Sequence, residues 1–523
     1  MSPTGITLAE LERRLWEAAD KLWANSNLRP SEYSVPVLGL IFLRYADVRF
    51  QRAKLQLESQ GGSRRREIGK EDYKALGVMY LPEAARWDNL LSLPDGADIG
   101  KALNDAMKAI EADNEDLKDV LPKTYNRIQT KLLNSLFRTF NLIPADIEGD
   151  AFGRIYEYFM SEFEATVGQK GGEFFTPTSI VKLIVEIIEP FHGKIFDPAC
   201  GSGGMFVQSA QFVERHKHRP SDEIAVYGQE KTAETVRICR MNLAINGISG
   251  DIKQGNSYYE NSHSSLGKFD FVMANPPFNV SEIDKERIKD DKRFPYGMPS
   301  ADNGNYIWIQ LFLSALNSSG RAGFVMPNTA ADSSNEFEIR KQIVESDVVD
   351  CMIEVTSNFF YTVTLPCSLW FFDKQKDESR KGKTLFIDAR SIFSQVSRVH
   401  REFTPQQTEF LANIVRLYKG KQTENEHGSA ELLEVHFGSR SPSKFKNVPG
   451  LCYVASLQEI SKKNFSLNAG NYVGVKSQTA PTNDYRATIS KSASRLDELS
   501  REAVQTDKEI LAFLKDILSE SEK

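Results

Sequence analysis

Short apolar runs alternate with amphipathic stretches from about Ala151 onward. The runs predicted to be buried strands are Ile195–Phe196, Ile224–Tyr227, Phe269–Ala274, Ala322–Met326 and Val348–Val355. Helical stretches such as Ala233–Asn246 and Tyr306–Leu316 separate them. A chain in which strands and helices alternate covers both faces of a sheet with its own helices, which leaves few architectures open. We therefore predict an α/β fold with a mainly parallel, doubly wound sheet.

Two further regions flank this part of the chain. The first, up to about Asp150, is predicted to be helical because apolar residues recur at helical spacing. After a polar, linker-like stretch, Gln478–Asp484, a seam of apolar residues begins and must be buried on the chain's own core or on a partner helix. The residues of this seam are Ile489, Leu496, Ala503, Ile510 and Ile517. We predict a helical N-terminal domain over 1–150, an α/β domain over 151–475, and a linker with a C-terminal helix over 476–523.

The charge and the cysteine content limit the chemistry. The 523 residues carry 65 Lys and Arg against 71 Asp and Glu, a net charge of −6, whereas a protein that holds DNA unaided usually has a basic footprint. A nucleic-acid substrate would therefore need a local basic surface or a partner subunit. No apolar stretch is long enough to cross a bilayer. The five cysteines form no CxxC pair that would indicate a zinc site or a disulfide framework. The sequence thus favours a cytoplasmic protein without a membrane segment or a bound metal.

The first candidate site is a glycine-rich turn. It follows the strand that ends at Asp197, holds Gly201, Ser202, Gly203 and Gly204, and leads into a predicted helix. Glycines let a backbone turn tightly and let a ligand approach closely. A turn of this kind is often only structural, but its place in an alternating fold favours a ligand site.

Two later strand ends carry the other candidates. Glu230 ends the next predicted strand, a position at which an acid in doubly wound folds often accepts hydrogen bonds from ribose hydroxyls. Asn275–Phe278, with the sequence Asn-Pro-Pro-Phe, directly follows the strand Phe269–Ala274. Its two prolines end the strand and stiffen the turn, while the ring of Phe278 can stack on a flat base. A glycine-rich turn, an acid at the next strand end and an Asn-Pro-Pro-Phe tetrapeptide rarely occur in this order by chance.

In this order, the three features resemble the amino-methyltransferases that use S-adenosylmethionine. Within that group the chain is similar, over essentially its whole length, to the methylation subunit of type I restriction-modification systems. The resemblance implies a Rossmann-like methyltransferase sheet and an adenine-N6 DNA methyltransferase. It also implies three partners: DNA, a specificity subunit that supplies sequence recognition, and a restriction and translocation subunit. The terminal helix would then be a candidate for partner packing.

The resemblance implies roles for individual residues as well. Those implied to bind S-adenosylmethionine are Glu173, Phe174, Phe175, Thr176, Pro177, Thr178, Asp197, Gly201, Ser202, Gly203, Gly204, Glu230 and Asn256. Asn275, Pro276, Pro277 and Phe278 match the catalytic tetrapeptide. The stretch from Gly450–Tyr453 through Leu467–Val473 is similar to the family's usual ending, but Ala469 and Asn471 stand where Pro and Arg are expected.

The chemistry of the tetrapeptide can be argued physically. The exocyclic amine of adenine is a poor nucleophile because its lone pair is delocalised into the ring. The side-chain oxygen of Asn275 and the main-chain carbonyl of Pro276 can accept hydrogen bonds from the two N–H groups of this amine and so localise its lone pair. A sulfonium methyl is already a good electrophile, so alignment and fixed dipoles are enough for catalysis. The base must first leave the duplex, and stacking on Phe278 offsets part of that cost.

Some alternatives remain open at this point. The same tetrapeptide also serves cytosine N4 and protein glutamine amides, and a non-catalytic assembly subunit is a third possibility. Cys367 lies in a strand-like context rather than a catalytic turn, which argues against cytosine C5 chemistry. Gly382-Lys383-Thr384 lacks the first glycine of a phosphate loop, because Asp377 stands in its place. The stretch Asn279–Asn305 is either a mobile loop over the base or a plain surface insertion.

Overall fold

The computed structural model describes residues 8–24, 28, 30–60, 68–94, 96–143, 155–160, 162–163, 176–360, 365–397 and 400–475, and five single helical positions at 494, 497, 500, 501 and 506. The chain divides into two compact units, Met1–Gly474 and Val475–Lys523. The predicted linker and the apolar seam of the second unit lie outside the described residues. No helix in the described ranges has the length and apolar character needed to cross a membrane.

The first part of the chain is helical, as predicted. Its α-helices are α1 (Leu8–Ala24), α2 (Pro30–Gln60), α3 (Lys70–Ala75), α4 (Trp87–Leu91), α5 (Ile99–Asp113) and α6 (Thr130–Phe140), with short 3-10 turns at Glu83–Ala85, Glu115–Leu117 and Tyr125–Arg127. They share one core, in which side chains such as Leu40, Trp87 and Leu103 are fully buried. This burial stabilises short helices that would be marginal alone.

The helical spacing of residues Thr124–Phe140 predicts one helix over this stretch, but the helix begins later. Residues Tyr125–Arg127 form a 3-10 turn, and α6 starts only at Thr130. Tertiary hydrogen bonds explain the difference: the buried Tyr125 hydroxyl donates to the Pro36 carbonyl at 3.0 Å, and the Tyr125 N–H donates to Asn104 Oδ1 at 3.1 Å. These bonds hold the backbone in a turn against its local helical preference.

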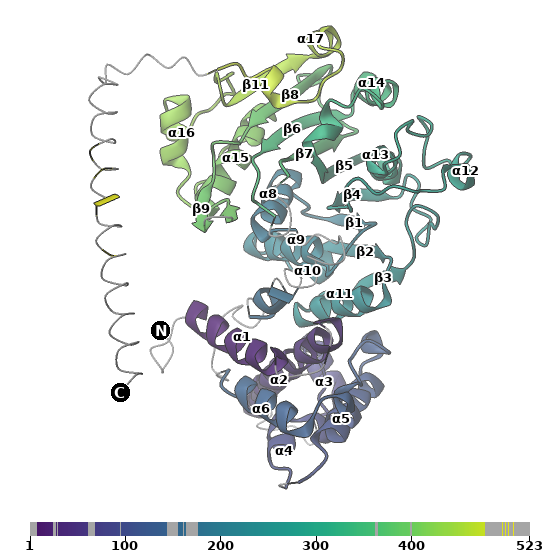
Figure 1. Cartoon of the computed structure of the whole chain (residues 1–523), viewed down its shortest axis with the longest axis vertical. Helices are drawn as coiled ribbons and strands as arrows, with labels where there is room; N and C mark the ends of the chain where they lie inside the picture. The colour runs from purple at the N-terminus through teal and green to yellow at the C-terminus, as the bar shows by residue number, and fades with distance from the viewer. Residues whose placement is uncertain are drawn as a thin grey trace, which may run out of the picture. The chain divides into compact units, whose positions relative to one another are not determined.

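A nine-stranded sheet forms the centre of the α/β part (Figure 1). Its spatial order is β11-β8-β6-β7-β5-β4-β1-β2-β3. The strands are β1 (Gly193–Asp197), β2 (Ile224–Glu230), β3 (Gly250–Gln254), β4 (Phe269–Ala274), β5 (Leu316–Pro327), β6 (Val349–Val355), β7 (Cys367–Asp373), β8 (Lys383–Asp388) and β11 (Cys452–Ser456). Neighbouring pairs are parallel except that β7 is antiparallel to β5 and β6, and β11 is antiparallel to β8. The prediction of a mainly parallel sheet is confirmed.

Helices cover both faces of this sheet. They are α8 (Thr178–Ile188), α9 (Gly204–Arg215), α10 (Pro220–Glu223), α11 (Ala233–Ile245), α12 (Lys285–Ile288), α13 (Asn305–Ala315), α14 (Phe337–Glu345), α15 (Pro405–Tyr418), α16 (Ala430–Phe437) and α17 (Leu457–Lys462). Phe206 of α9 and Phe410 of α15 belong to one core, and Phe312 of α13 and Ile343 of α14 to another. Two cores on one sheet are the arrangement of a doubly wound fold. A small hairpin, β9 (Ser394–Ser397) and β10 (His400–Glu402), stands apart from the sheet.

Helix α11 connects the helical region to the glycine turn. Its residues Met241 and Ile245 are buried in the same core as the N-terminal helices, and the Tyr45 hydroxyl of α2 donates to the Ile245 carbonyl. Figure 1 shows α11 above α1 and α2 at the border of the sheet. From the same helix, Asn242 Nδ2 donates to the Ser202 carbonyl at 2.9 Å. The helical region therefore supports the turn through α11.

Candidate active site

The candidate residues gather at one edge of the sheet, where the strand order reverses. Strand β1 lies between β2 and β4 and is parallel to both, with Asp197 opposite Gly228 and Phe196 opposite Val272. The carboxyl ends of these strands therefore share an edge, where doubly wound folds form their ligand crevice. Asp197, Glu230 and Asn275 all stand at or just beyond these strand ends.

The glycine turn needs glycine at two positions. Gly201 and Gly203 have φ angles of 50° and 85°, in the left-handed region that side chains disfavour. The turn is closed by the Gly203 N–H, which donates to the Cys200 carbonyl at 2.8 Å, and α9 begins at the next residue. A Cβ on Gly203 would lie 2.9 Å from the Cys239 Sγ of α11. Sequence alone explains the glycines by a tight turn, and the structure adds close packing against α11.

Replacing Gly203 with alanine is expected to weaken cofactor binding about tenfold, because left-handed backbone at a non-glycine residue costs about 1–2 kcal/mol and the Cβ displaces Cys239. The dissociation constant for S-adenosylmethionine, measured by calorimetry, checks this. Gly247→Ala is the matched control: its φ is 65°, but no atom lies within 4 Å of the added Cβ. Equal dissociation constants for the two variants would contradict the assigned role of the turn.

Asp197 is the most deeply buried carboxyl at this edge, with 2% of its surface exposed. Its Oδ1 accepts the Ala199 N–H at 2.9 Å. Burial raises the pKa of Asp197 to about 8; the Ala199 N–H acts against this shift, and the negative charge of Glu230 adds to it. No salt bridge joins Asp197 to a cation in the described ranges, so a cationic ligand bound beside it would favour its ionised form.

Glu230 holds the glycine turn to β2. Its Oε2 accepts the Gly201 N–H at 3.1 Å, and its Oε1 accepts the N–H groups of Lys231 at 2.7 Å and Thr232 at 3.3 Å. The carboxylate is thus fixed at the strand end at which the sequence predicts a ribose contact.

The remaining predicted cofactor residues are placed less directly. Asn256 follows β3, and its Oδ1 accepts the Tyr258 N–H at 3.1 Å in a local turn. The adjacent Ser257 hydroxyl donates to the Pro198 carbonyl at 2.6 Å, which joins this turn to the end of β1. Thr176, Pro177 and Thr178 lead into α8, which packs against α9. Three further predicted residues lie outside the described ones, namely Glu173, Phe174 and Phe175.

The tetrapeptide after β4 presents an unsatisfied amide. Both Oδ1 and Nδ2 of Asn275 are buried, and neither has a hydrogen-bond partner among the described residues. A buried polar group left unpaired costs about 1–3 kcal/mol, so this amide is a candidate for contact with a ligand. Pro276 and Pro277 stiffen the backbone that carries it. Its place just after β4, beside the ends of β1 and β2, makes it the strongest such candidate at this edge.

The ring of Phe278 is held by an aromatic neighbour that the sequence reasoning missed. Phe278 is 9% exposed, and its ring lies edge-to-face with that of Phe360, at 6.1 Å between centroids and 76° between planes. Phe360 comes from the segment after β6, more than eighty positions away in the sequence. No sequence signal marks this pair, because only the strand order brings the two segments together.

The stretch between Asn279 and Asn305 is packed rather than free. It contains α12, and its Ile288 and Phe294 are buried. The buried Arg293 guanidinium donates to the Ser257 carbonyl at 2.8 Å and the Tyr258 carbonyl at 3.2 Å. These contacts favour an ordered insertion over a mobile loop.

The structure also shows where Cys367 and the Gly382-Lys383-Thr384 stretch lie, the two features that the sequence argued against as functional sites. Cys367 is the first residue of β7, and burial raises the pKa of its thiol to about 12, so it is not a thiolate nucleophile. Lys383 and Thr384 are the first residues of β8 rather than the end of a phosphate loop.

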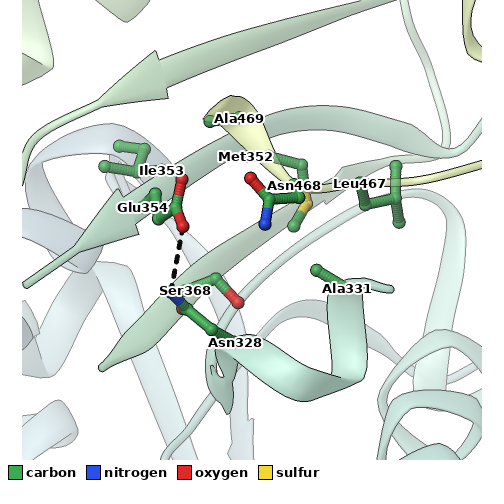
Figure 2. Close-up of a pocket in the computed structure, with 9 residues that line it drawn as sticks. All are labelled: Asn328, Ala331, Met352, Ile353, Glu354, Ser368, Leu467, Asn468 and Ala469. Carbon is green, nitrogen blue, oxygen red and sulfur yellow. Dashed lines mark hydrogen bonds between the residues drawn. The ribbon is translucent and has the colours of Figure 1, made fainter. Parts of the chain in front are cut away.

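A small pocket lies farther along the same edge (Figure 2). Its lining residues are Asn328, Ala331, Met352, Ile353, Glu354, Ser368, Leu467, Asn468 and Ala469. Asn328 Nδ2 donates to Glu354 Oε1 at 3.0 Å, the dashed line in Figure 2, and the Gly470 N–H donates to Glu354 Oε2 at 3.3 Å. Burial raises the pKa of Glu354, which the Arg390 guanidinium partly offsets. The carboxyl group therefore ties the segment with the unusual Ala469 and Asn471 to the ends of β5 and β6.

Sequence comparison identifies similar families and relatives. A family described as N-6 DNA methylase matches residues 147–480, and one described as the HsdM N-terminal domain matches residues 11–140. The type I restriction enzyme MjaIX methylase subunit of Methanocaldococcus jannaschii is 37% identical, over 89% of this chain and 84% of its own length. The HindI methylase subunit of Haemophilus influenzae is 34% identical, over 83% and 98%.

Comparison with solved structures agrees on the fold. The type I restriction-modification methyltransferase subunit from Streptococcus thermophilus superposes with a TM-score of 0.68 and 20% identity, over 90% of this chain and 100% of that one. A modification subunit of a putative type I restriction enzyme from Vibrio vulnificus gives 0.56 and 19%, over 86% and 93%. At this identity the likeness supports the fold alone.

Proposed function

The chain belongs to the N-6 DNA methylase family, and on that premise we propose that the crevice at the carboxyl ends of β1, β2 and β4 holds S-adenosylmethionine beside Asn275. The family fixes the reaction. The protein is an adenine-specific DNA methyltransferase, the methylation subunit of a type I restriction-modification system. The unsatisfied Asn275 amide carries the assignment of the site.

The residues of the crevice fit a cationic nucleoside cofactor. Asp197 supplies a buried carboxyl without a cationic partner in the described ranges, and Glu230 places a fixed carboxylate at the next strand end. The glycine turn leaves space beside Gly201, where no atom lies within 4 Å of an added Cβ. This edge of the sheet therefore offers a carboxyl group for the positive charge of the cofactor and a carboxylate for its ribose hydroxyls. It also offers a backbone turn that the cofactor can approach closely.

The catalytic work falls on the turn after β4. S-adenosylmethionine supplies an electrophilic methyl group when bound. Asn275 Oδ1 and the Pro276 carbonyl accept hydrogen bonds from the two N–H groups of the adenine amine. These bonds localise the lone pair of the amine on its nitrogen. Pro276 and Pro277 keep both acceptors fixed, so little reorganisation is needed at the moment of transfer. Phe278, steadied by Phe360, offers a ring face or edge to the extruded base.

Partner subunits follow from the charge of the chain and from its family. A net charge of −6 is a poor footprint for DNA, so we propose that a specificity subunit supplies sequence recognition and much of the phosphate contact. In the full complex a restriction and translocation subunit would join them.

The five cysteines are all free and buried, which supports a reducing compartment such as the cytoplasm.

Methyl transfer from tritiated S-adenosylmethionine to unmethylated DNA tests this proposal. Full-length protein assembled with its specificity subunit is expected to label DNA at specific sites, whereas the chain alone should label it poorly. Mass spectrometry of the digested nucleosides should find N6-methyladenine. N4-methylcytosine, or label in protein instead of DNA, would contradict the adenine assignment. Full site-specific activity of the isolated chain would contradict borrowed recognition.

A further inference from the structure

A reciprocal amide pair stands directly behind the catalytic tetrapeptide. The Asn279 N–H donates to Asn305 Oδ1 at 3.0 Å, and Asn305 Nδ2 donates to Asn279 Oδ1 at 2.9 Å. Asn279 follows Phe278 directly and has a φ of 54°, in the left-handed region. Asn305 is the first residue of α13 and is 4% exposed. The pair therefore fixes an unusual backbone conformation next to the reacting turn.

The chemistry of the pair is directional. A backbone N–H can only donate, so the atom of Asn305 facing the Asn279 N–H must be its oxygen. The nitrogen of the same amide then faces Asn279 Oδ1. Residue 305 must consequently both accept and donate, whereas the side chain of residue 279 needs only to accept.

The helix that begins at Asn305 is held against the segment that follows β3. The Trp308 indole of α13 donates to the Tyr258 hydroxyl at 2.6 Å, and Tyr258 is joined to Asn256 through its backbone. Gly304, just before α13, packs so closely on Tyr258 that a Cβ would lie 2.7 Å from its hydroxyl. A continuous set of contacts thus leads from the predicted cofactor side of the crevice to Asn305.

We propose that Asn305 is a positioning residue for methyl transfer: by gripping Asn279 it sets the orientation of Asn275–Phe278 relative to the segment after β3. The proposal rests on the proposed function of the site. Asn305 acts through Asn279, because its side chain bonds to the backbone N–H and to the side chain of that residue. Its loss should lower kcat, because small misplacements of reacting groups cost large factors in rate. Cofactor binding should be spared, since the glycine turn and Asp197 are untouched.

Two substitutions separate positioning from a merely structural role. Asn305→Ala removes both the acceptor and the donor that hold Asn279. Asn279→Asp keeps both hydrogen bonds, because its carboxylate still accepts from Asn305 Nδ2, and aspartate tolerates the left-handed backbone. In the full-length protein assembled with its specificity subunit, kcat for DNA methylation should fall about 100-fold in Asn305→Ala and stay near wild type in Asn279→Asp. The dissociation constant for S-adenosylmethionine should be unchanged in both.

A third variant tests the same hydrogen bond without changing the buried residue Asn305, whose substitution could unfold the protein. Asn279 is exposed, so Asn279→Gly leaves the core intact, accepts the left-handed φ and removes only the Oδ1 acceptor. Loss of that one bond should lower kcat about tenfold. Wild-type kcat in Asn279→Gly, or equal losses in Asn305→Ala and Asn279→Asp, would overturn the proposal. Absence of methyl transfer by the wild-type complex would instead refute the proposed function, so the two failures are distinguishable.

Discussion

Replacing Asn275 with alanine is expected to lower kcat for DNA methylation by about 100- to 1000-fold, the loss typical of removing one preorganised polar group from a reacting centre. The variant removes Oδ1, which accepts an N–H of the adenine amine, while the Pro276 carbonyl remains. Because the side chain of Asn275 has no hydrogen-bond partner among the described residues, its loss breaks no internal hydrogen bond there. The melting temperature should therefore stay near wild type, and so should the affinity for S-adenosylmethionine.

Asn328→Ala provides the matched control. Asn328 stands just beyond the end of β5, the strand next to β4, and its Oδ1 is also buried without a partner in the described residues. Its Nδ2, however, is bonded to Glu354, so this variant should lose about 1–3 kcal/mol of stability while keeping its kcat. Wild-type turnover in Asn275→Ala, measured by tritium transfer to DNA, would remove Asn275 from the mechanism.

Replacing Asp197 with asparagine is expected to stabilise the free protein while weakening its binding of S-adenosylmethionine. The folded pKa of about 8 lies above the ordinary value of 3.8, so the folded state keeps a proton that the unfolded chain loses between these values. The wild-type free energy of unfolding should therefore fall, relative to the variant, by up to about 1.4 kcal/mol per pH unit as pH rises from 4 to 8. Loss of the charged group should weaken cofactor binding by about 10- to 100-fold.

Chemical denaturation across this pH range and calorimetry with the cofactor measure the two effects. Asp222→Asn, at an exposed carboxylate of α10, controls for the loss of one negative charge. A stability difference between Asp197→Asn and the wild type that does not grow with pH would contradict the buried, uncompensated carboxyl. Unchanged cofactor affinity would contradict its place in the binding site.

Local sequence patterns were sufficient for the parts of the fold in which neighbours in the chain are neighbours in space. Strand β4 ends with its apolar run at Ala274, whereas β1 and β2 continue beyond theirs to Asp197 and Glu230; each candidate motif lies at or just after one of these ends. The direction of β7 could not be predicted in this way. Its apolar run indicates a strand, but its insertion between β5 and β6, antiparallel to both, depends on long-range pairing.

The same distinction applies to the site. Asp197, the glycine turn and Asn275–Phe278 are contiguous with strand ends, so order along the chain was enough to place them on one edge. Phe360 reaches Phe278, and Asn305 reaches Asn279 just after the tetrapeptide, from other segments of the chain, and neither carries a local pattern that marks it. The 3-10 turn at Tyr125 is a similar case, since the buried tertiary bonds of Tyr125 decide its conformation.

A crystal structure of the full-length protein with S-adenosylmethionine would show where the cofactor binds. We expect it over the glycine turn, near the carboxyl groups of Asp197 and Glu230, with its methyl group facing the side that Asn275 Oδ1 and the Pro276 carbonyl present to the base. A cofactor bound elsewhere on the chain, or a methyl group turned away from Asn275, would contradict this expectation.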